Sequence, residues 1–161
     1  MATATVSFTP DKDAIFSEVL VLAPPERVFQ ALTDPTQLPK WWGQAGEYRI
    51  TKFEADVRPG GKWKTIGVGA DGKEFEVYGE YIEVDPPRVL EHTWVANWTG
   101  AAGSLVRWEL IPSTGGTLAK LRHSGLKNHP DAGKSYASGW PRVIGWMQAY
   151  VEKGATIETR G

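Results

Sequence analysis

The chain has 161 residues, eight of them Trp and none of them Cys, and its formal net charge at pH 7 is −1. This length fits one domain that buries roughly 70% of its unfolded surface. The near-neutral charge excludes strong overall attraction to nucleic acid or to an anionic membrane, and the lack of Cys excludes disulfides and thiolate catalysis. With no apolar run near the roughly 20 residues of a membrane span, and no signal-peptide pattern, we expect a cytoplasmic protein.

The first part of the chain predicts one strand followed by two short helices. Residues 1–13 are small and polar and are expected to form a flexible segment. Residues 14–22 are rich in β-branched and apolar side chains and predict a strand, which the following Pro pair ends. Apolar residues at helical spacing predict a helix over 25–33. Residues 36–42 predict a second short helix, whose apolar face carries Leu38, Trp41 and Trp42.

The middle of the chain alternates apolar and polar residues and predicts six further strands. Runs rich in Gly and Pro, such as Asp71-Gly72 and Asp85-Pro86-Pro87, mark the turns between them. Consecutive strands on short turns predict an antiparallel sheet, with one small-residue loop over 99–103. The predicted strands cover residues 48–57, 62–68, 73–84, 88–98, 104–111 and 117–124.

The last part of the chain predicts one long amphipathic helix, after a loop over 125–133. Trp140, Ile144 and Met147 recur at helical spacing and define its apolar face. This face is buried if the helix lies across the hollow side of the sheet. We therefore expect an α+β helix-grip fold, in which a curved antiparallel sheet of about seven strands wraps around a long C-terminal helix and two short helices lie between strands one and two. The expected domain covers 14–155, followed by a C-terminal tail over 156–161.

Several motifs in this order resemble one known superfamily. The segment from Leu22 to Pro35, followed by Trp41-Trp42, resembles the opening of START-like (SRPBCC) proteins. The chain is also similar to the branch named after the activator of the ninety-kilodalton heat-shock protein ATPase, over about residues 15–153. The segments that carry this second similarity include Asp56 to Gly61, Gly79 to Leu90, His123 to Leu126 and Gly139 to Pro141. The resemblance implies the helix-grip fold and a cavity between sheet and C-terminal helix that holds a hydrophobic ligand.

The resemblance implies no single reaction, because its members include lipid and steroid carriers, hormone sensors and polyketide cyclases. We expect a monomer or weak homodimer that binds a small hydrophobic or amphipathic ligand, without cofactor or metal, and the resemblance implies a stress-related role. A cyclase- or hydratase-type enzyme that uses a pocket His or carboxylate is the second hypothesis. A chaperone-associated regulatory module with an exposed sheet edge is the third.

Strand alternation predicts which side chains face the C-terminal helix. On three neighbouring strands the apolar residues share one face and the charged residues share the other, and His92 and His123 lie on the apolar face of the first and third of these strands. A filled core without a cavity is the opposing interpretation, because protein interiors normally close to crystal-like density. The residues expected to line a ligand pocket are Trp41, Trp42, Trp63, Tyr81, Trp94, Trp108, Leu121, His123, Trp140, Ile144 and Met147.

Two of these predictions have a structural alternative. His123 is expected either to anchor a ligand carbonyl or to be satisfied by a backbone or Trp partner, and Tyr78 or Tyr81 is a further polar anchor. Trp41 and Trp42 form either a lid over the ligand or a plug, in which Trp42 fills the core and Trp41 half covers it. No His pair has the spacing of a metal site, so no metal is expected.

Overall fold

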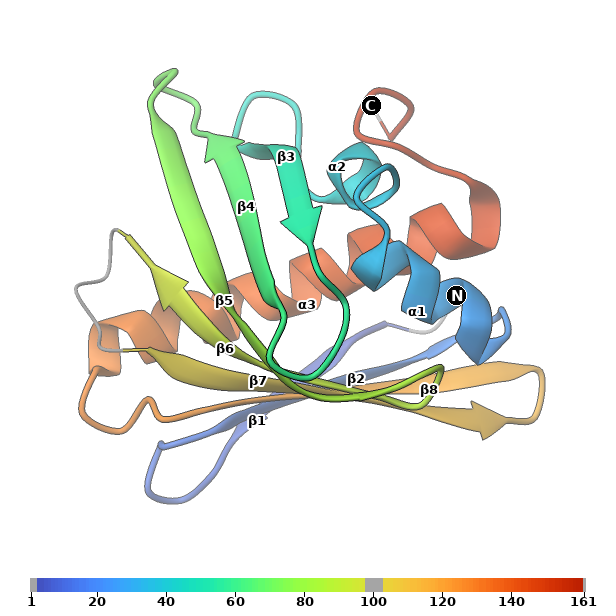
Figure 1. Ribbon diagram of the computed structural model, residues 1–161, viewed down its shortest axis with the longest axis horizontal. Helices are drawn as coiled ribbons and strands as arrows, with labels where there is room; N and C mark the ends of the chain where they lie inside the picture. Colours follow the sequence, from blue (N-terminus) through green and yellow to red (C-terminus); the bar gives the residue numbers. More distant parts are fainter. Residues whose placement is uncertain (1–2, 98–102, 161) are drawn as a thin grey trace.

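A computed structural model, which describes residues 3–97 and 103–160, contains an eight-stranded antiparallel sheet that curves around one long helix (Figure 1). The strand order is β1-β2-β8-β7-β6-β5-β4-β3, so the sheet is a meander except where β2 meets β8. The elements are β1 (Thr5–Phe8), β2 (Ile15–Val21), α1 (Pro25–Thr33), α2 (Leu38–Trp41), β3 (Arg49–Ala55), β4 (Lys62–Val68), β5 (Glu74–Asp85), β6 (Val89–Ala96), β7 (Ser104–Ser113), β8 (Gly116–Ser124) and α3 (Pro130–Lys153).

These elements confirm the predicted α+β helix-grip fold. The sheet has one strand more than expected, because Thr5–Phe8 pairs with β2 inside the segment predicted to be flexible. All four residues of β1 are exposed, so no buried alternation marks this strand in the sequence. Its pairing relies on the ladder and on the Ser17 hydroxyl, which donates to the Thr5 carbonyl at 2.6 Å. Most of the loop predicted over 99–103 lies outside the described residues.

The long helix begins at Pro130, earlier than the predicted start after residue 133. Proline is favourable in the first turn of a helix, because its missing N–H has no partner there in any case. The helix ends where Gly154 adopts a left-handed backbone with φ 71°, a conformation that glycine adopts at little cost. No helix in the described part of the chain is long and apolar enough to cross a membrane.

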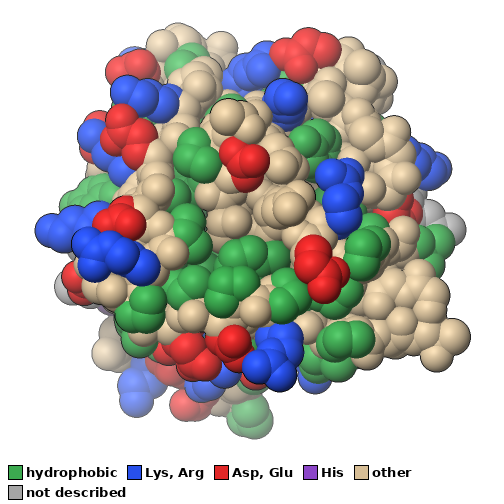
Figure 2. Space-filling model, turned by 45° about the vertical axis from the view of Figure 1, so that its right-hand side comes forward, with side chains coloured by type: hydrophobic (Ala, Val, Ile, Leu, Met, Phe, Trp, Pro, Cys, Tyr) green, Lys and Arg blue, Asp and Glu red, His purple; other side chains and the backbone are tan. Residues whose placement is uncertain are grey.

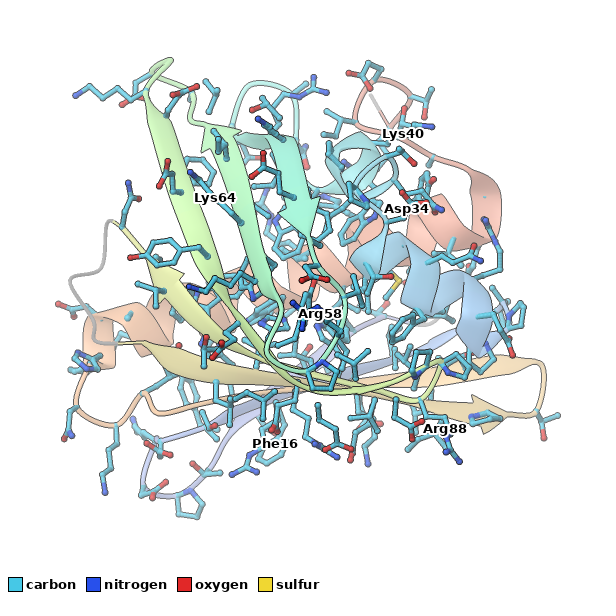
Figure 3. All side chains as sticks on the ribbon, in the orientation of Figure 1. Phe16, Asp34, Lys40, Arg58, Lys64 and Arg88 are labelled. Carbon is cyan, nitrogen blue, oxygen red and sulfur yellow. The ribbon has the colours of Figure 1, made fainter. Side chains whose placement is uncertain are left out.

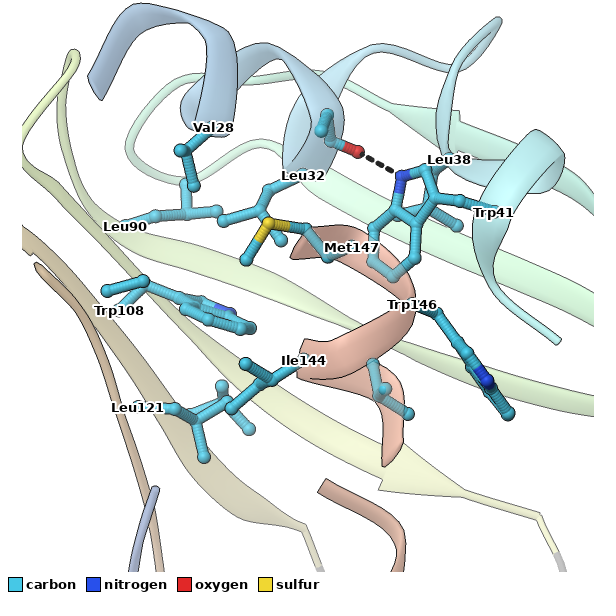
Figure 4. Packing of buried hydrophobic residues seen from close by; sticks show 14 of the residues in the cluster. Val28, Leu32, Leu38, Trp41, Leu90, Trp108, Leu121, Ile144, Trp146 and Met147 are labelled. Atoms are coloured by element: carbon cyan, nitrogen blue, oxygen red, sulfur yellow. Dashed lines mark hydrogen bonds between the residues drawn. The ribbon is translucent and has the colours of Figure 1, made fainter. Parts of the chain in front are cut away.

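The core lies between α3 and the hollow face of the sheet. Buried residues alternate along β6, β7 and β8, as predicted from the sequence pattern. Figure 4 shows Ile144 and Met147 of α3 in a cluster with Trp108, Leu121 and other core residues. Both α3 side chains have no exposed surface, so this half of the interior is filled.

Residues 156–160, which were expected to lie in a C-terminal tail, fold back over α2. Ile157 is buried, and its backbone N–H donates to the Lys40 carbonyl at 2.8 Å. The Arg160 guanidinium donates to the carbonyls of Trp41 and Gly43. These contacts hold α2 and the loop after it, and that loop contributes to the candidate site described next.

Candidate functional site

A groove of about 870 Å³ lies between the N-terminal half of α3 and the β4–β5 hairpin, which stands above that half of the helix in Figure 1. Residues 135–143 of α3 form one wall, and β3, β4, β5 and the hairpin form the other. The lining side chains are mostly apolar or aromatic, and they include Trp42, Tyr48, Ile50, Phe75, Val77, Trp94, Tyr136, Trp140 and Val143.

Three indoles pack against one another along the groove. Trp42 stacks on Trp94 with ring centroids 6.4 Å apart and meets Trp140 edge-on at 5.9 Å. The centroids of the Trp94 and Trp140 rings are 5.3 Å apart. Aromatic pairs of this kind are worth about 0.5–1.5 kcal/mol each beyond the area they bury. The flat surfaces are therefore held in place before any ligand arrives.

The neighbouring residues Trp41 and Trp42 have different surroundings. Trp41 is fully buried, and its Nε1–H donates to the Ala31 carbonyl at 3.0 Å (Figure 4). Trp42 is half-buried and lines the groove. The predicted plug had these two roles the other way round. The reason is that α2 ends at Trp41, and Trp42 has an extended backbone with ψ 97° that leaves the helix.

The residues predicted to line a pocket are divided by the structure into three sets. Trp42, Trp94 and Trp140 line the groove. Trp63, Tyr81 and Trp108 border a second cavity of about 30 Å³, together with those three indoles. The remaining members line neither space among the described residues and belong to the buried interior; they are Trp41, Leu121, His123, Ile144 and Met147.

His123 is fully buried, and protein groups occupy both of its ring nitrogens. Its Nδ1 accepts from the Trp140 Nε1–H at 3.0 Å, and its Nε2 lies 2.6 Å from the Ser104 hydroxyl. Because an indole N–H only donates, Nδ1 carries the lone pair and Nε2 carries the proton. Burial lowers the pKa of His123 to about 3. A Trp partner thus satisfies His123, and the ring has no free lone pair for a general base.

His92 is the other buried imidazole on the hollow face. Its Nδ1 donates to the Thr93 carbonyl at 2.9 Å, and burial lowers its pKa to about 4. The Trp94 ring lies between His92 and His123, at centroid distances of 6.3 and 5.6 Å. Glu76 of β5 pairs with Lys64 of β4, and both of those side chains are about 40% exposed. Among the described residues no cluster of three or more metal-ligating side chains is formed.

Several groove residues were missed by the sequence analysis. Tyr136 of α3 accepts a hydrogen bond from the Trp94 Nε1–H at 3.1 Å. It lies four residues before Trp140, so extending the apolar stripe toward the start of the helix would have found it. The Tyr48 ring meets the Phe75 ring edge-on, with centroids 5.8 Å apart. Phe75 lies on the inward side of β5, and its neighbours Glu74 and Glu76 lie on the outer side. Tyr48 was assigned to the start of the strand predicted over 48–57, but it lies in the loop just before β3.

Charged residues lie at the rim of the groove. Arg142 pairs with Glu47 at 2.6 Å, with both side chains 45% exposed, and its guanidinium lies over the Trp146 ring. Lys73 and Glu74 of the hairpin stand on the other side. Exposed ion pairs contribute about 0–1 kcal/mol, so this rim adds little to stability. It places both signs of charge at the mouth of an apolar groove.

Apolar side chains outside the groove are spread over several strands. Phe16 is 43% exposed and points away from α3 (Figure 3), and Tyr78 is 44% exposed on the outer face of β5, away from the groove. Figure 2 shows a face on which apolar side chains gather near the centre and charged side chains of both signs surround them. The other exposed large apolar residues in the described ranges are Val6, Phe8, Leu22, Ile82 and Ile111.

Comparison with solved structures identifies the same fold in bacterial proteins. A protein from Rhodobacter sphaeroides superposes with a TM-score of 0.80 at 20% identity, over 92% of this chain and 97% of that chain. Protein Ms6760 from Mycobacterium smegmatis gives 0.79 at 23% identity, over 97% and 98%. An AHSA1-like protein from Aeromonas hydrophila gives 0.73 at 22% identity, over 88% and 93%. At these identities the likeness shows the fold alone.

A search of curated proteins gave no significant match. The sequence profile described as "Activator of Hsp90 ATPase homolog 1-like protein" matches residues 22–152, from the end of β2 almost to the end of α3. This span includes every element that forms the groove. The chain therefore belongs to the Activator of Hsp90 ATPase homolog 1-like family, within the START-like superfamily.

Proposed function

We propose that the protein binds a small hydrophobic or amphipathic molecule in the groove between α3 and the sheet. The observation that carries this proposal is a groove of about 870 Å³ with packed indoles along it. Ligand pockets are typically about 300–1,000 Å³ and mostly apolar, with a few polar groups that fix orientation. Apolar burial at about 25 cal/mol per Å² supplies the affinity.

Flat, uncharged ring systems are the ligands that suit these walls. Trp94 and Trp140 offer aromatic surface, and the hydroxyl of Tyr136 lies at 3.1 Å from the Trp94 Nε1–H at the same place. The charged groups stand only at the rim, where Arg142 pairs with Glu47. An amphipathic ligand would therefore bury its apolar body among the indoles and leave any charge at the mouth.

Binding rather than catalysis is the proposal, because His123, the pocket histidine expected from the sequence, is not placed for proton transfer. His123 has both ring nitrogens engaged, by Ser104 and Trp140. Its hydrogen-bond partners in the described structure include no carboxylate, which the enzyme hypothesis would need beside it.

Two glycines of α3 provide a matched test. Gly139 lines the groove and Gly145 does not, and a Cβ added at either position meets no atom within 4 Å. Gly139→Leu should therefore fill the groove without disturbing the helix, while Gly145→Leu makes the same change away from it. We expect the fluorescent probe N-phenyl-1-naphthylamine to bind the wild type and Gly145→Leu equally, and to bind Gly139→Leu at least about tenfold more weakly.

Native mass spectrometry of protein purified from its own host identifies the ligand class. We expect a retained apolar molecule on the wild type and none on Gly139→Leu. Equal probe binding by Gly139→Leu and Gly145→Leu would show that the groove is not the binding site. A wild type that binds neither probe nor host molecule would refute the proposal itself.

A further inference from the structure

A second cavity, here called the inner chamber, lies next to the groove and is not used by the proposal above. Its volume of about 30 Å³ is enough to hold a group of the size of a water molecule. Trp42, Trp94 and Trp140 line both the groove and the chamber. Because the same three indoles border both spaces, the chamber adjoins the groove.

One polar atom at this chamber lacks a partner. Trp63 borders the chamber and is only 6% exposed. Its Nε1–H is buried and has no hydrogen-bond partner in the structure. Buried donors in native proteins are almost always paired, and one left unpaired is costly. The Trp63 N–H therefore marks a place where an acceptor atom is needed.

An unused acceptor lies beside this donor. The His92 ring meets Trp63 edge-on at 4.8 Å and Tyr81 edge-on at 5.9 Å. A backbone carbonyl only accepts, so the contact with Thr93 places the His92 proton on Nδ1 and the lone pair on Nε2. Among the described residues neither this lone pair nor the Tyr81 hydroxyl has a hydrogen-bond partner.

We propose that the inner chamber is the subsite for one hydroxyl group of a ligand whose flat apolar body lies in the groove, an inference that rests on the proposed function. A hydroxyl accepts from Trp63 and donates to His92, whereas a carbonyl or ether oxygen accepts only and leaves His92 unpaired. No Lys, Arg, Asp or Glu borders the chamber in the described structure. A carboxylate or ammonium there would be buried without an opposite charge, which is strongly unfavourable.

Paired probes of equal shape test the chamber. In 2-naphthol and 2-methylnaphthalene a hydroxyl replaces a methyl group of similar size, so the probes have nearly the same shape and differ in hydrogen bonding and in the hydration of that substituent. We expect calorimetric titration of the wild type to give about tenfold tighter binding of 2-naphthol, equivalent to about 1.4 kcal/mol. Equal binding of the two probes would overturn the assignment of the chamber as a hydroxyl subsite, while the proposal that the groove binds a ligand would still hold. If neither binds, and N-phenyl-1-naphthylamine also fails, both proposals are overturned.

Two Trp→Phe variants separate the chamber from general effects of losing an indole. Trp63→Phe removes the unpaired N–H, and the preference for 2-naphthol over 2-methylnaphthalene should fall below about threefold. Trp146→Phe is the matched control, because Trp146 is also buried but lines neither cavity. A preference that survives Trp63→Phe, or is lost equally in Trp146→Phe, would overturn the assignment.

A measurement on the wild type avoids any dependence on how well Trp63→Phe folds. The indole N–H resonance of Trp63 in a ¹H–¹⁵N NMR spectrum should move on addition of 2-naphthol, because the N–H gains an acceptor. It should move much less with 2-methylnaphthalene. Equal shifts with both probes would show that the hydroxyl does not reach Trp63, and would overturn the chamber.

Discussion

The two halves of α3 meet the same sheet with opposite results. Around Ile144 and Met147 the interior is filled, and neither side chain has exposed surface. Around Gly139 the same helix borders a groove of about 870 Å³. Three small residues of α3, Ser135, Ser138 and Gly139, border the groove, whereas Ile144, Met147 and Val151 are buried in the other half. A single helix thus contributes to the filled core along one half and to one wall of the groove along the other.

The largest expected effect comes from opening the filled half. Ile144→Ala should destabilise the fold by about 3–4 kcal/mol, because the surrounding side chains cannot collapse into the space. Val143→Ala, at the groove, should cost only about 1–2 kcal/mol, because the space it leaves joins a groove that is already open. Urea unfolding followed by circular dichroism measures both. Equal losses at the two positions would erase the proposed distinction between the halves.

Acid should destabilise the fold through the two buried histidines, His92 and His123. The pKa values of His92 and His123 are lowered by burial to about 4 and about 3, below the unfolded value near 6.5. The unfolded chain therefore binds more protons below about pH 6.5, and stability falls as pH falls toward 4, by about 3 kcal/mol for each histidine. Unfolding free energies measured between pH 7 and 4 give the slope.

A histidine variant isolates this contribution from that of the carboxylates. His123→Gln should lower stability at pH 7 and flatten the dependence on pH, since one group that must stay neutral in the fold has been removed. The third histidine, in the loop before α3, supplies the control variant His129→Gln. If His123→Gln leaves the slope unchanged, His123 is not the group that resists protonation.

A smaller effect is expected from the two helical glycines. Gly139→Leu and Gly145→Leu should each raise the free energy of unfolding by about 0.5–1 kcal/mol, because leucine favours helix and neither position is crowded. Thermal unfolding in the absence of ligand measures this gain. A loss of stability at Gly139 alone would mean that the groove closes in solution and that the leucine clashes with its far wall.

The smallest effect is expected at the rim. Breaking the exposed Arg142–Glu47 pair with Glu47→Gln should change the free energy of unfolding by less than about 1 kcal/mol. Binding of the uncharged probe N-phenyl-1-naphthylamine should change by less than about twofold. A much larger loss of probe binding would show that the pair holds the Tyr48 loop, and with it one wall of the groove.

Sequence patterns identified most of the fold because most elements are regular and half-buried. The strand predicted over 62–68 agrees with β4, and the alternation on β6, β7 and β8 identified the buried faces. The edge strand β1 was missed because all of its side chains are exposed. The buried Ile157 was predicted to lie in a tail, since a single apolar residue near the end of a chain has no periodicity to reveal its contact.

The candidate site was only partly accessible to the same reasoning. Alternation and helical spacing are enough to assign Trp94 and Trp140 to the inward faces, and they line the groove. These patterns cannot distinguish an inward side chain at a cavity from one in a filled core. Leu121 and Met147 were therefore grouped with Trp94 and Trp140. Whether an inward side chain meets a cavity depends on the element that faces it. At the groove this is the distance between the β4–β5 hairpin and α3, which neither segment encodes alone.

The sequence by itself determined the order of elements from β2 onward, most of their buried faces and the family, because periodicity and turn residues are local properties. Only the tertiary structure decided that Trp41 is the core residue and Trp42 the groove residue, that His123 is buried with its Nδ1 hydrogen-bonded to Trp140, and that Trp63 has an unpaired N–H beside His92. Hydrogen-bond partners and empty volume arise from the packing of segments distant in the chain, so no single stretch of sequence specifies them.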